Sequence, residues 1–203
     1  MKLKLLRRIA LVMLLSGGTW QIGEGSYIYA KAQLAQKLIL DAWEKGVANN
    51  RPVKPWSWAD TWPVARLIVP RLEIDQIVLA GDNGRALAFG PGHRFGSALP
   101  GESGNSLISG HRDTHFSFLN KLRINDEVLV QDQTGVVHRY VIDSYEVIDE
   151  STPVMGSAGQ SQLTLVTCYP FDAIVPGGPF RYVVMATEKG VDKINIQEDI
   201  VRF

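Results

Sequence analysis

From Val64 onward the chain is a series of short apolar runs rich in β-branched residues, and this feature limits the possible folds more than any other. The runs are separated by Gly, Pro, Asp and Asn, which favour turns. They read "VARLIVPRLEIDQIVLA", "NSLISG", "DEVLVQDQ", "VVHRYVIDSYEVID", "QLTLVTC" and "RYVVMATE". Strands at this spacing predict an all-β barrel or sandwich. Residues 83–90 and 114–123 have a helix-like pattern, which predicts two short helices packed on the sheet.

The first 25 residues have a different pattern. Four cations, at positions 2, 4, 7 and 8, precede an uncharged segment at residues 9–23. This pattern is typical of an export signal or a membrane anchor whose cations stay in the cytoplasm. As a helix the segment would reach about 22 Å, less than the roughly 30 Å hydrocarbon core, so both alternatives stay open. The Ala-Lys-Ala triplet at 30–32 offers a cleavage pattern but lies far beyond the apolar centre. We therefore expect an uncleaved anchor.

Residues 26–62 connect the two regions. Residues 26–46 place Ile28, Leu34 and Leu38 at roughly helical spacing, which predicts a helix ending at Gly46. Residues 49–63 contain three prolines and three tryptophans, a composition that suits an extended linker lying on an apolar surface. We expect a signal anchor at 1–25, a stalk and linker at 26–62, and the main domain at 63–203.

The amino-acid composition limits the classes of function that the chain can have. With 203 residues, 45% of them apolar, the chain can bury one core. Lys plus Arg equals Asp plus Glu at 21 each, and this absence of a basic excess argues against nucleic acid as a partner. Cys168 is the only cysteine, so it has no intramolecular disulfide partner.

Cys168 ends the run "QLTLVTC" and precedes a loop rich in Pro and Gly. A strand end beside such a loop is a position where a side chain can face a cleft. An inert buried cysteine is the alternative interpretation. An exported thiol is open to oxidation, which favours a functional reason for keeping it.

A base and a cation complete a candidate constellation. His111, in "SLISGHRDTHF", also follows a strand-like run and is the preferred base, with His115 and His93 as rivals. His138 lies inside a strand-like run and has no predicted role. Arg181 opens the strand after the loop that follows Cys168.

Together, Cys168, His111 and Arg181 suit acyl transfer through a thioester. The thiolate attacks a peptide carbonyl, imidazolium protonates the leaving amine, and guanidinium stabilises the oxyanion or holds the substrate backbone.

These motifs resemble those of the sortases, cysteine transpeptidases with an eight-stranded β-barrel. The likeness rests on "TLVTC", an arginine thirteen positions after the cysteine, and "GPGHRFGSALPGESGNSLISGHRD" upstream, and it runs from about Val64 to Glu188. The text "PWSWADTWPVARL", "HRDTHFSFL" and "TCYPFDAIVPGGPFRYVV" is similar in particular to the proteobacterial type. That type implies a Gram-negative inner membrane, with the catalytic domain in the periplasm.

The resemblance implies an enzyme that cleaves an LPXTG-like signal near the C-terminus of an exported protein and transfers the acyl group to an amine. By motif match, Cys168 is the nucleophile, His111 the general acid and base, and Arg181 the oxyanion or substrate residue. Thr167 would contribute to the substrate pocket, bordered by loops 149–162 and 169–180. No cofactor is implied. Some sortases bind calcium through an acidic cluster, but Asp113 and Glu102 are only loose candidates here, so we expect no metal.

Three alternatives remain at this stage. A thiol peptidase would use the same three residues and release the acyl group to water. A zinc site could use His111, His115 and Cys168, because His-x-x-x-His places two ligands on one helix face. No HExxH glutamate or fourth ligand accompanies them. A non-catalytic, membrane-anchored barrel that binds a partner is the third alternative.

Overall fold

The computed structural model describes residues 2–154, 159–175 and 177–192. The chain divides into two compact units, one up to Lys37 and one from Leu38 onward. The domain boundaries expected from the sequence, after residues 25 and 62, stay predictions.

One helix, α1 (Lys2–Asn49), crosses the boundary between the two units. It does not end at Gly46, as the sequence predicted, because the left-handed residue that terminates it is Asn50, with φ 48°. The amide of Asn50 donates to the Val47 carbonyl and that of Arg51 to the Gly46 carbonyl, at 3.3 and 3.1 Å. This is the Schellman arrangement, which satisfies the last carbonyls of a helix.

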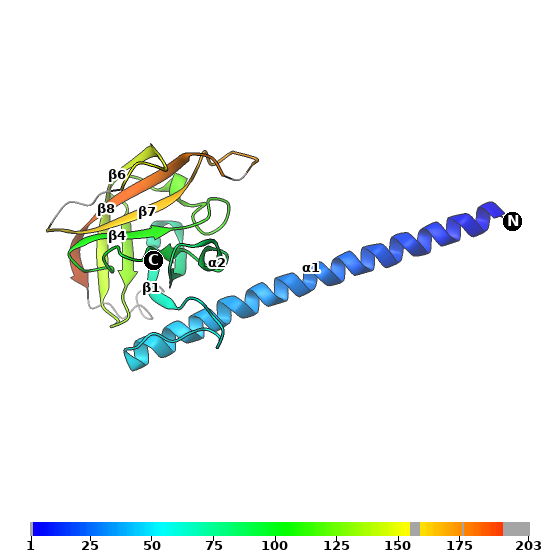
Figure 1. The fold of residues 1–203 in the computed structure, drawn as a ribbon, viewed down its shortest axis with the longest axis horizontal. Coiled ribbons are helices and arrows are strands. Elements are labelled where there is room, and N and C mark those ends of the chain that lie inside the picture. The colour runs from blue at the N-terminus through cyan, green and yellow to red at the C-terminus, as the bar shows by residue number, and fades with distance from the viewer. Residues whose placement is uncertain (1, 155–158, 176, 193–203) are drawn as a thin grey trace. The chain divides into compact units, whose positions relative to one another are not determined.

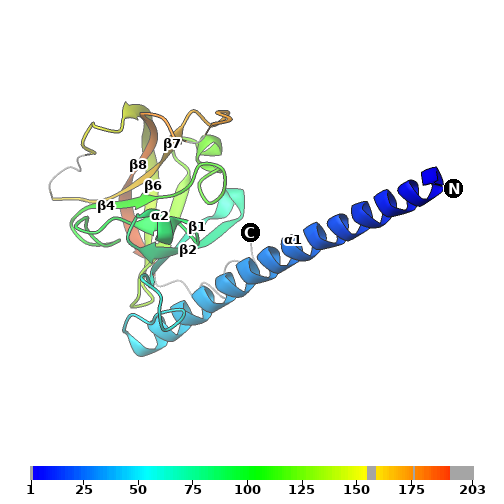
Figure 2. The ribbon, with the colours of Figure 1, turned by 45° about the vertical axis from the view of Figure 1, so that its right-hand side comes forward.

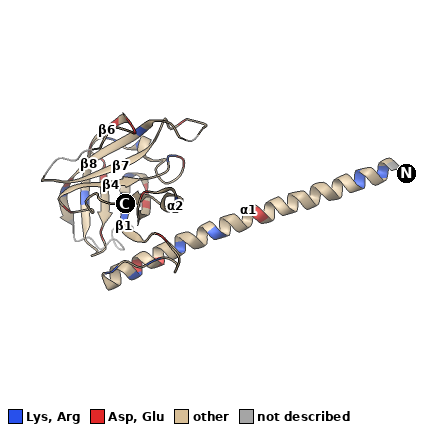
Figure 3. Cartoon of the chain, viewed as in Figure 1, with Lys and Arg blue, Asp and Glu red and all other residues tan. Residues whose placement is uncertain are grey.

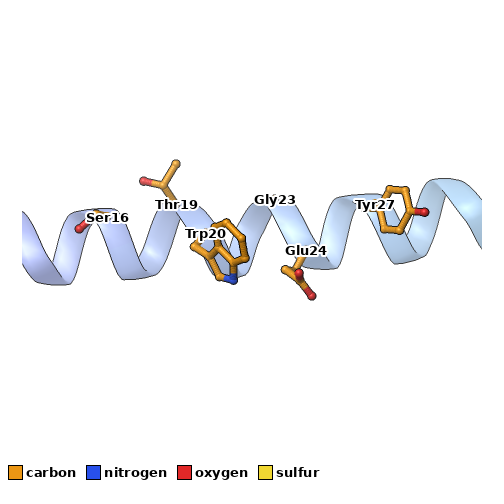
Figure 4. A pocket seen from close by; sticks show the side chains of 6 residues that line it. All are labelled: Ser16, Thr19, Trp20, Gly23, Glu24 and Tyr27. Carbon is orange, nitrogen blue, oxygen red and sulfur yellow. The ribbon is translucent and has the colours of Figure 1, made fainter.

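The N-terminal part of α1 corrects one expectation. Among the described residues, no helix has the length and apolarity needed to cross a membrane, so the membrane anchor expected over residues 1–25 is not borne out. The uncharged segment is too polar because it includes Ser16, Gly17, Gly18, Thr19, Gln21 and Gly23. The hollow shown in Figure 4 is formed by side chains of this one helix, from Ser16 to Tyr27, and encloses no site.

The second unit contains the predicted β-barrel (Figure 1). In the described chain its strands close in the order β1-β2-β3-β4-β7-β8-β6-β5, with β5 pairing back onto β1. Figure 2 shows the same strands curving around the interior from a second angle. The pairs β2·β3 and β4·β7 are parallel and the others antiparallel. The strands are β1 (Pro63–Val69), β2 (Ile74–Ala80), β3 (Gly92–His93), β4 (Gly104–Ser109), β5 (Glu127–Gln131), β6 (Val137–Asp149), β7 (Ser161–Tyr169) and β8 (Phe180–Asp192).

The helices of the barrel are shorter than the helical segments predicted from the sequence. Of residues 83–90 only α2 (Gly84–Leu87) is helical, and the Asn83 side chain caps it by accepting from the amides of Arg85 and Ala86. Residues 114–123 form turns followed by the 3-10 helix η2 (Leu119–Lys121). A second 3-10 helix, η1 (Pro70–Leu72), joins β1 to β2.

Alternation along the strands gives the barrel two apolar faces. The interior core takes Ile108 from β4, Leu165 from β7 and Val184 from β8. Their neighbours point outward into a second cluster, called here the outer patch: Leu107, Val166 and Val183, with Ile148, Val154 and Met185 against them. On the barrel, basic and acidic positions are mixed and do not gather on one strand (Figure 3). The outer patch is therefore a second apolar cluster on the outer side of β4, β7 and β8, and its residues Leu107, Val166 and Val183 are buried.

Candidate active site

Three adjacent strands bring the predicted residues into one row. Cys168 of β7 lies directly opposite Arg181 of β8. On the other side, β4 pairs with β7 up to Ser109 and Val166, and the Gly110 amide continues the ladder to the Val166 carbonyl at 3.0 Å. His111 lies two residues past the end of β4, and continuing the same register by two residues would put it opposite Cys168. Since neighbouring strands lie about 4.8 Å apart, the register predicted for acyl transfer is present.

The three side chains also share a face. Cys168 is two residues after Val166, and Arg181 two residues before Val183, both members of the outer patch. The period of two along a strand therefore puts them on the outside of the barrel. Cys168 is a free thiol of intermediate exposure, and His111 is exposed. The site therefore lies on the outside of the barrel, next to the buried residues of the outer patch.

Thr167 faces the opposite way. It is 2% exposed, and its hydroxyl donates to the Gly110 carbonyl at 2.7 Å. This hydrogen bond joins the end of β7 to the end of β4, directly beneath Cys168 and His111. The structure thus places Thr167 under the site as a link between strands, and its predicted contact with substrate stays a prediction.

A tight turn orients His111. Its carbonyl accepts hydrogen bonds from the amides of Thr114 and Phe116, at 3.3 and 3.0 Å. Gly110 permits the turn, because a Cβ at this position would lie 2.5 Å from the Phe116 ring. The glycine before the histidine is therefore required by the close approach of an aromatic side chain.

His115 lies near His111 in a different environment. It is half-buried, and its carbonyl accepts from the Gln76 side chain at 3.0 Å. Desolvation, and then the charge of His111, lower the pKa of His115 below its ordinary value. Residues 111–118 form turns rather than a helix, and among the described residues no group of three or more His, Cys, Asp or Glu side chains could hold a metal ion.

Arg181 is engaged by an acidic partner that the sequence analysis missed. Its guanidinium forms an ion pair with Glu150, just after β6, and also donates to the carbonyls of Gly178 and Phe180 at 2.7 and 2.9 Å. The register signals this neighbour, because Ile148 lies opposite Arg181 in the β6–β8 pair. The Glu150 carboxylate therefore competes with any other negatively charged group for the Arg181 guanidinium.

The other histidines lie outside this row. His93 is buried, with its Nε2 at 2.8 Å from the Ala98 carbonyl oxygen. His138, in β6, is buried between Glu188 and Asp132, at 2.9 and 3.1 Å.

A family model for the sortase domain matches residues 67–189. The chain belongs to the sortase family. Sortase D of Bacillus subtilis (strain 168) is 30% identical over 125 residues, which are 58% of this chain and 60% of that protein. This sortase therefore spans about three-fifths of the length of the curated relative.

Solved sortases have the same fold. Streptococcus agalactiae sortase C1, in complex with MTSET, has a TM-score of 0.56 and 26% identity, covering 63% of this chain and 69% of that one. A Clostridium perfringens Sortase D5 transpeptidase has a TM-score of 0.62 and 23% identity, covering 78% and 99%. The family and the eight-stranded barrel predicted from the sequence are confirmed, while the proteobacterial type is not established by these relatives.

Proposed function

We propose that this sortase is a cysteine transpeptidase whose nucleophile is Cys168. The observation that supports this most is the pairing of Cys168 with Arg181 across β7 and β8, with His111 just past the end of the neighbouring strand β4. The Cys168 thiolate attacks a peptide carbonyl carbon, and the negative charge that develops on its oxygen is stabilised by Arg181. The C–N bond then breaks as His111 gives a proton to the leaving amine, which leaves a thioester. An incoming amine attacks the thioester carbonyl carbon and loses a proton to His111, and the C–S bond breaks to release the Cys168 thiolate.

The proposed substrate is an LPXTG-like sorting signal of an exported protein. The match of residues 67–189 to the sortase domain supports this substrate class, because sortases act on sorting signals. The acyl acceptor is proposed to be a primary amine.

The reaction is tested with the full chain, an LPXTG-like peptide and mass spectrometry of the products, with and without an added amine. We expect amide formation with the amine, a trapped acyl-enzyme, and loss of both in Cys168→Ala. Hydrolysis alone at saturating amine would support the thiol peptidase instead. Unchanged cellular function of Cys168→Ala would support the non-catalytic barrel.

The location is a separate proposal. The cations at positions 2–8 ahead of an uncharged segment support export, and the motifs similar to the proteobacterial type support action at the inner membrane of a Gram-negative cell, in the periplasm. A C-terminal alkaline phosphatase fusion should be active in cells, since that reporter requires export. An inactive phosphatase fusion together with a fluorescent cytoplasmic fusion would contradict this proposal.

A further inference from the structure

A buried arginine follows the catalytic histidine. Arg112 is 5% exposed, although arginine is rarely buried without partners. It donates to the Pro170 carbonyl at 2.7 Å and the Ala173 carbonyl at 2.9 Å. It also binds both carboxylate oxygens of Asp113, at 2.8 and 3.0 Å. One guanidinium thus has four acceptor atoms, and two of them belong to the loop after β7.

The position of these acceptors matters more than their number. Arg112 is next to His111 in the chain, and Pro170 is two residues after Cys168. The β4–β7 ladder ends with the hydrogen bond between Gly110 and Val166, so beyond it the two segments need other contacts to stay together. The rigid, planar guanidinium supplies such a contact at fixed geometry, which a flexible ammonium would not reproduce.

The charge of Arg112 also reaches the site. The pKa of Arg112 is raised, first by its hydrogen bonds to Asp113, against the opposing effect of desolvation. The charges of Asp113, Cys168 and Asp172 raise it further. A thiolate at Cys168 and this guanidinium therefore stabilise each other, in addition to any effect of Arg181.

We propose that Arg112 is a positioning residue of the acyl-transfer site: it holds His111 at its working distance from Cys168 and places a positive charge beside the thiolate. This inference rests on the proposed transpeptidase function and adds a residue to it. Arg112 contacts the backbone around the nucleophile, so its action on the reaction goes through His111 and Cys168.

The first measurement is kcat and KM for peptide and amine, per titrated Cys168 thiol, in Arg112→Lys and Arg112→Gln. Arg71→Gln is the matched control, because Arg71 also binds both oxygens of an aspartate, Asp126, and a backbone carbonyl. We expect kcat to fall by about 10- to 100-fold in both Arg112 variants, because misplacing a catalytic group by about 1 Å has effects of that order. KM should change little, and Arg71→Gln should keep the wild-type kcat.

The second measurement needs no enzymatic activity. Cys168 is modified by the cationic reagent MTSET and by a neutral methanethiosulfonate, and the ratio of the two rate constants is compared between variants. Both reagents react with the thiolate form of Cys168, so the fraction of thiolate affects both rate constants equally. The ratio of the MTSET rate constant to the neutral one therefore reports the charge near the thiol. Removing this cation should raise the ratio of the MTSET rate constant to the neutral one about threefold in Arg112→Gln, the effect that Coulomb's law gives for losing one nearby charge in water. Arg112→Lys and Arg71→Gln should keep the wild-type ratio.

These results decide the proposal separately from the function. A wild-type kcat per thiol in Arg112→Gln, or an unchanged MTSET ratio there, would overturn it. If neither Arg112 variant folds, Asp113→Asn replaces them, because Asp113 is 63% exposed in its side chain and its two carboxylate oxygens help to hold the Arg112 guanidinium in position. A several-fold fall in kcat supports the proposal, and no change overturns it. A wild-type protein that transfers no acyl group would contradict the proposed function, while the MTSET ratio would still test Arg112.

Discussion

His111 and His115 are four positions apart but differ in what surrounds them. His111 is exposed at the end of β4, in line with Cys168, whereas His115 is half-buried and its pKa is lowered by desolvation and by His111. A general acid must reach the leaving group and hold a proton to give. Its exposure lets His111 meet the first requirement, and the lowered pKa of His115 counts against His115 on the second.

Replacing each histidine separately tests this assignment. His111→Ala should lower kcat/KM by about 10²- to 10⁴-fold, the usual contribution of a general acid and base. His115→Ala should have a milder effect, because its imidazole is not in the row with Cys168. Steady-state assays with peptide and amine provide the comparison. Equal losses of kcat/KM in the two variants would contradict the assignment of this role to His111.

Glu150 is the residue expected to restrain Arg181. Glu150→Gln removes the charge that competes for the guanidinium, so KM for the peptide should fall by up to about fivefold, the range of a partly exposed ion pair. Asp60→Asn, which breaks the exposed Arg85–Asp60 pair elsewhere on the domain, is the control and should leave KM unchanged. A rise in KM in Glu150→Gln would show that Glu150 helps to hold Arg181 for substrate.

At the scale of elements, the site depends on the parallel pair β4·β7. The Thr167 hydroxyl joins the two strand ends at Gly110, on the interior side of the sheet. Thr164 makes a comparable hydrogen bond between the same two strands, to the Asn105 side chain at 2.9 Å, nearer their other end. Comparing variants of the two threonines therefore distinguishes an effect on the stability of the β4·β7 pair from an effect on the geometry of the site.

Thr167→Val and Thr164→Val are the matched variants. Thr167→Val leaves the buried Gly110 carbonyl without its donor, and Thr164→Val leaves the half-buried Asn105 side chain without its donor. Each should cost about 1–3 kcal/mol of unfolding free energy, measured by urea denaturation. Only Thr167→Val should also lower kcat, by about tenfold, because only its partner adjoins His111. A similar fall in kcat in both would mean that general destabilisation is responsible.

Sequence reasoning could place strands and strand ends but not their partners. The apolar runs and turn residues predicted the all-β fold, and Cys168, His111 and Arg181 were found because each lies where a run begins or ends. The pairing of β7 between β4 and β8 is a long-range contact that local patterns do not encode. Arg112 and Glu150 were missed for this reason, since their importance arises only from what the pairing brings next to them. The anchor expected over residues 1–25 is not borne out, because the polar and glycine residues within the uncharged segment lower its apolarity.

For the whole molecule, titrating groups set how stability depends on pH. His115 has a lowered folded pKa, so the unfolded chain binds more protons near its ordinary value of about 6.5, and stability falls as pH drops below that value. Asp126, whose pKa is lowered first by hydrogen bonds to Arg71, adds a loss below about pH 4.

Melting temperatures between pH 8 and 3 test this behaviour. We expect little change above about pH 7, a decline from about pH 6.5 to 5, and a steeper one below about pH 4. His115→Gln should flatten the first decline and keep the second. A first decline that persists unchanged in His115→Gln would attribute it to another group.

The hydrogen bond from Thr167 to Gly110 spans 57 positions of sequence. Contacts this distant form late, since a long loop must close before they contribute. During refolding, the residues around the Cys168 thiol are then not in place until β7 enters between β4 and β8. Acyl-transfer activity should therefore appear with the slowest folding phase. Before the barrel is complete, Cys168 is expected to have no transfer activity.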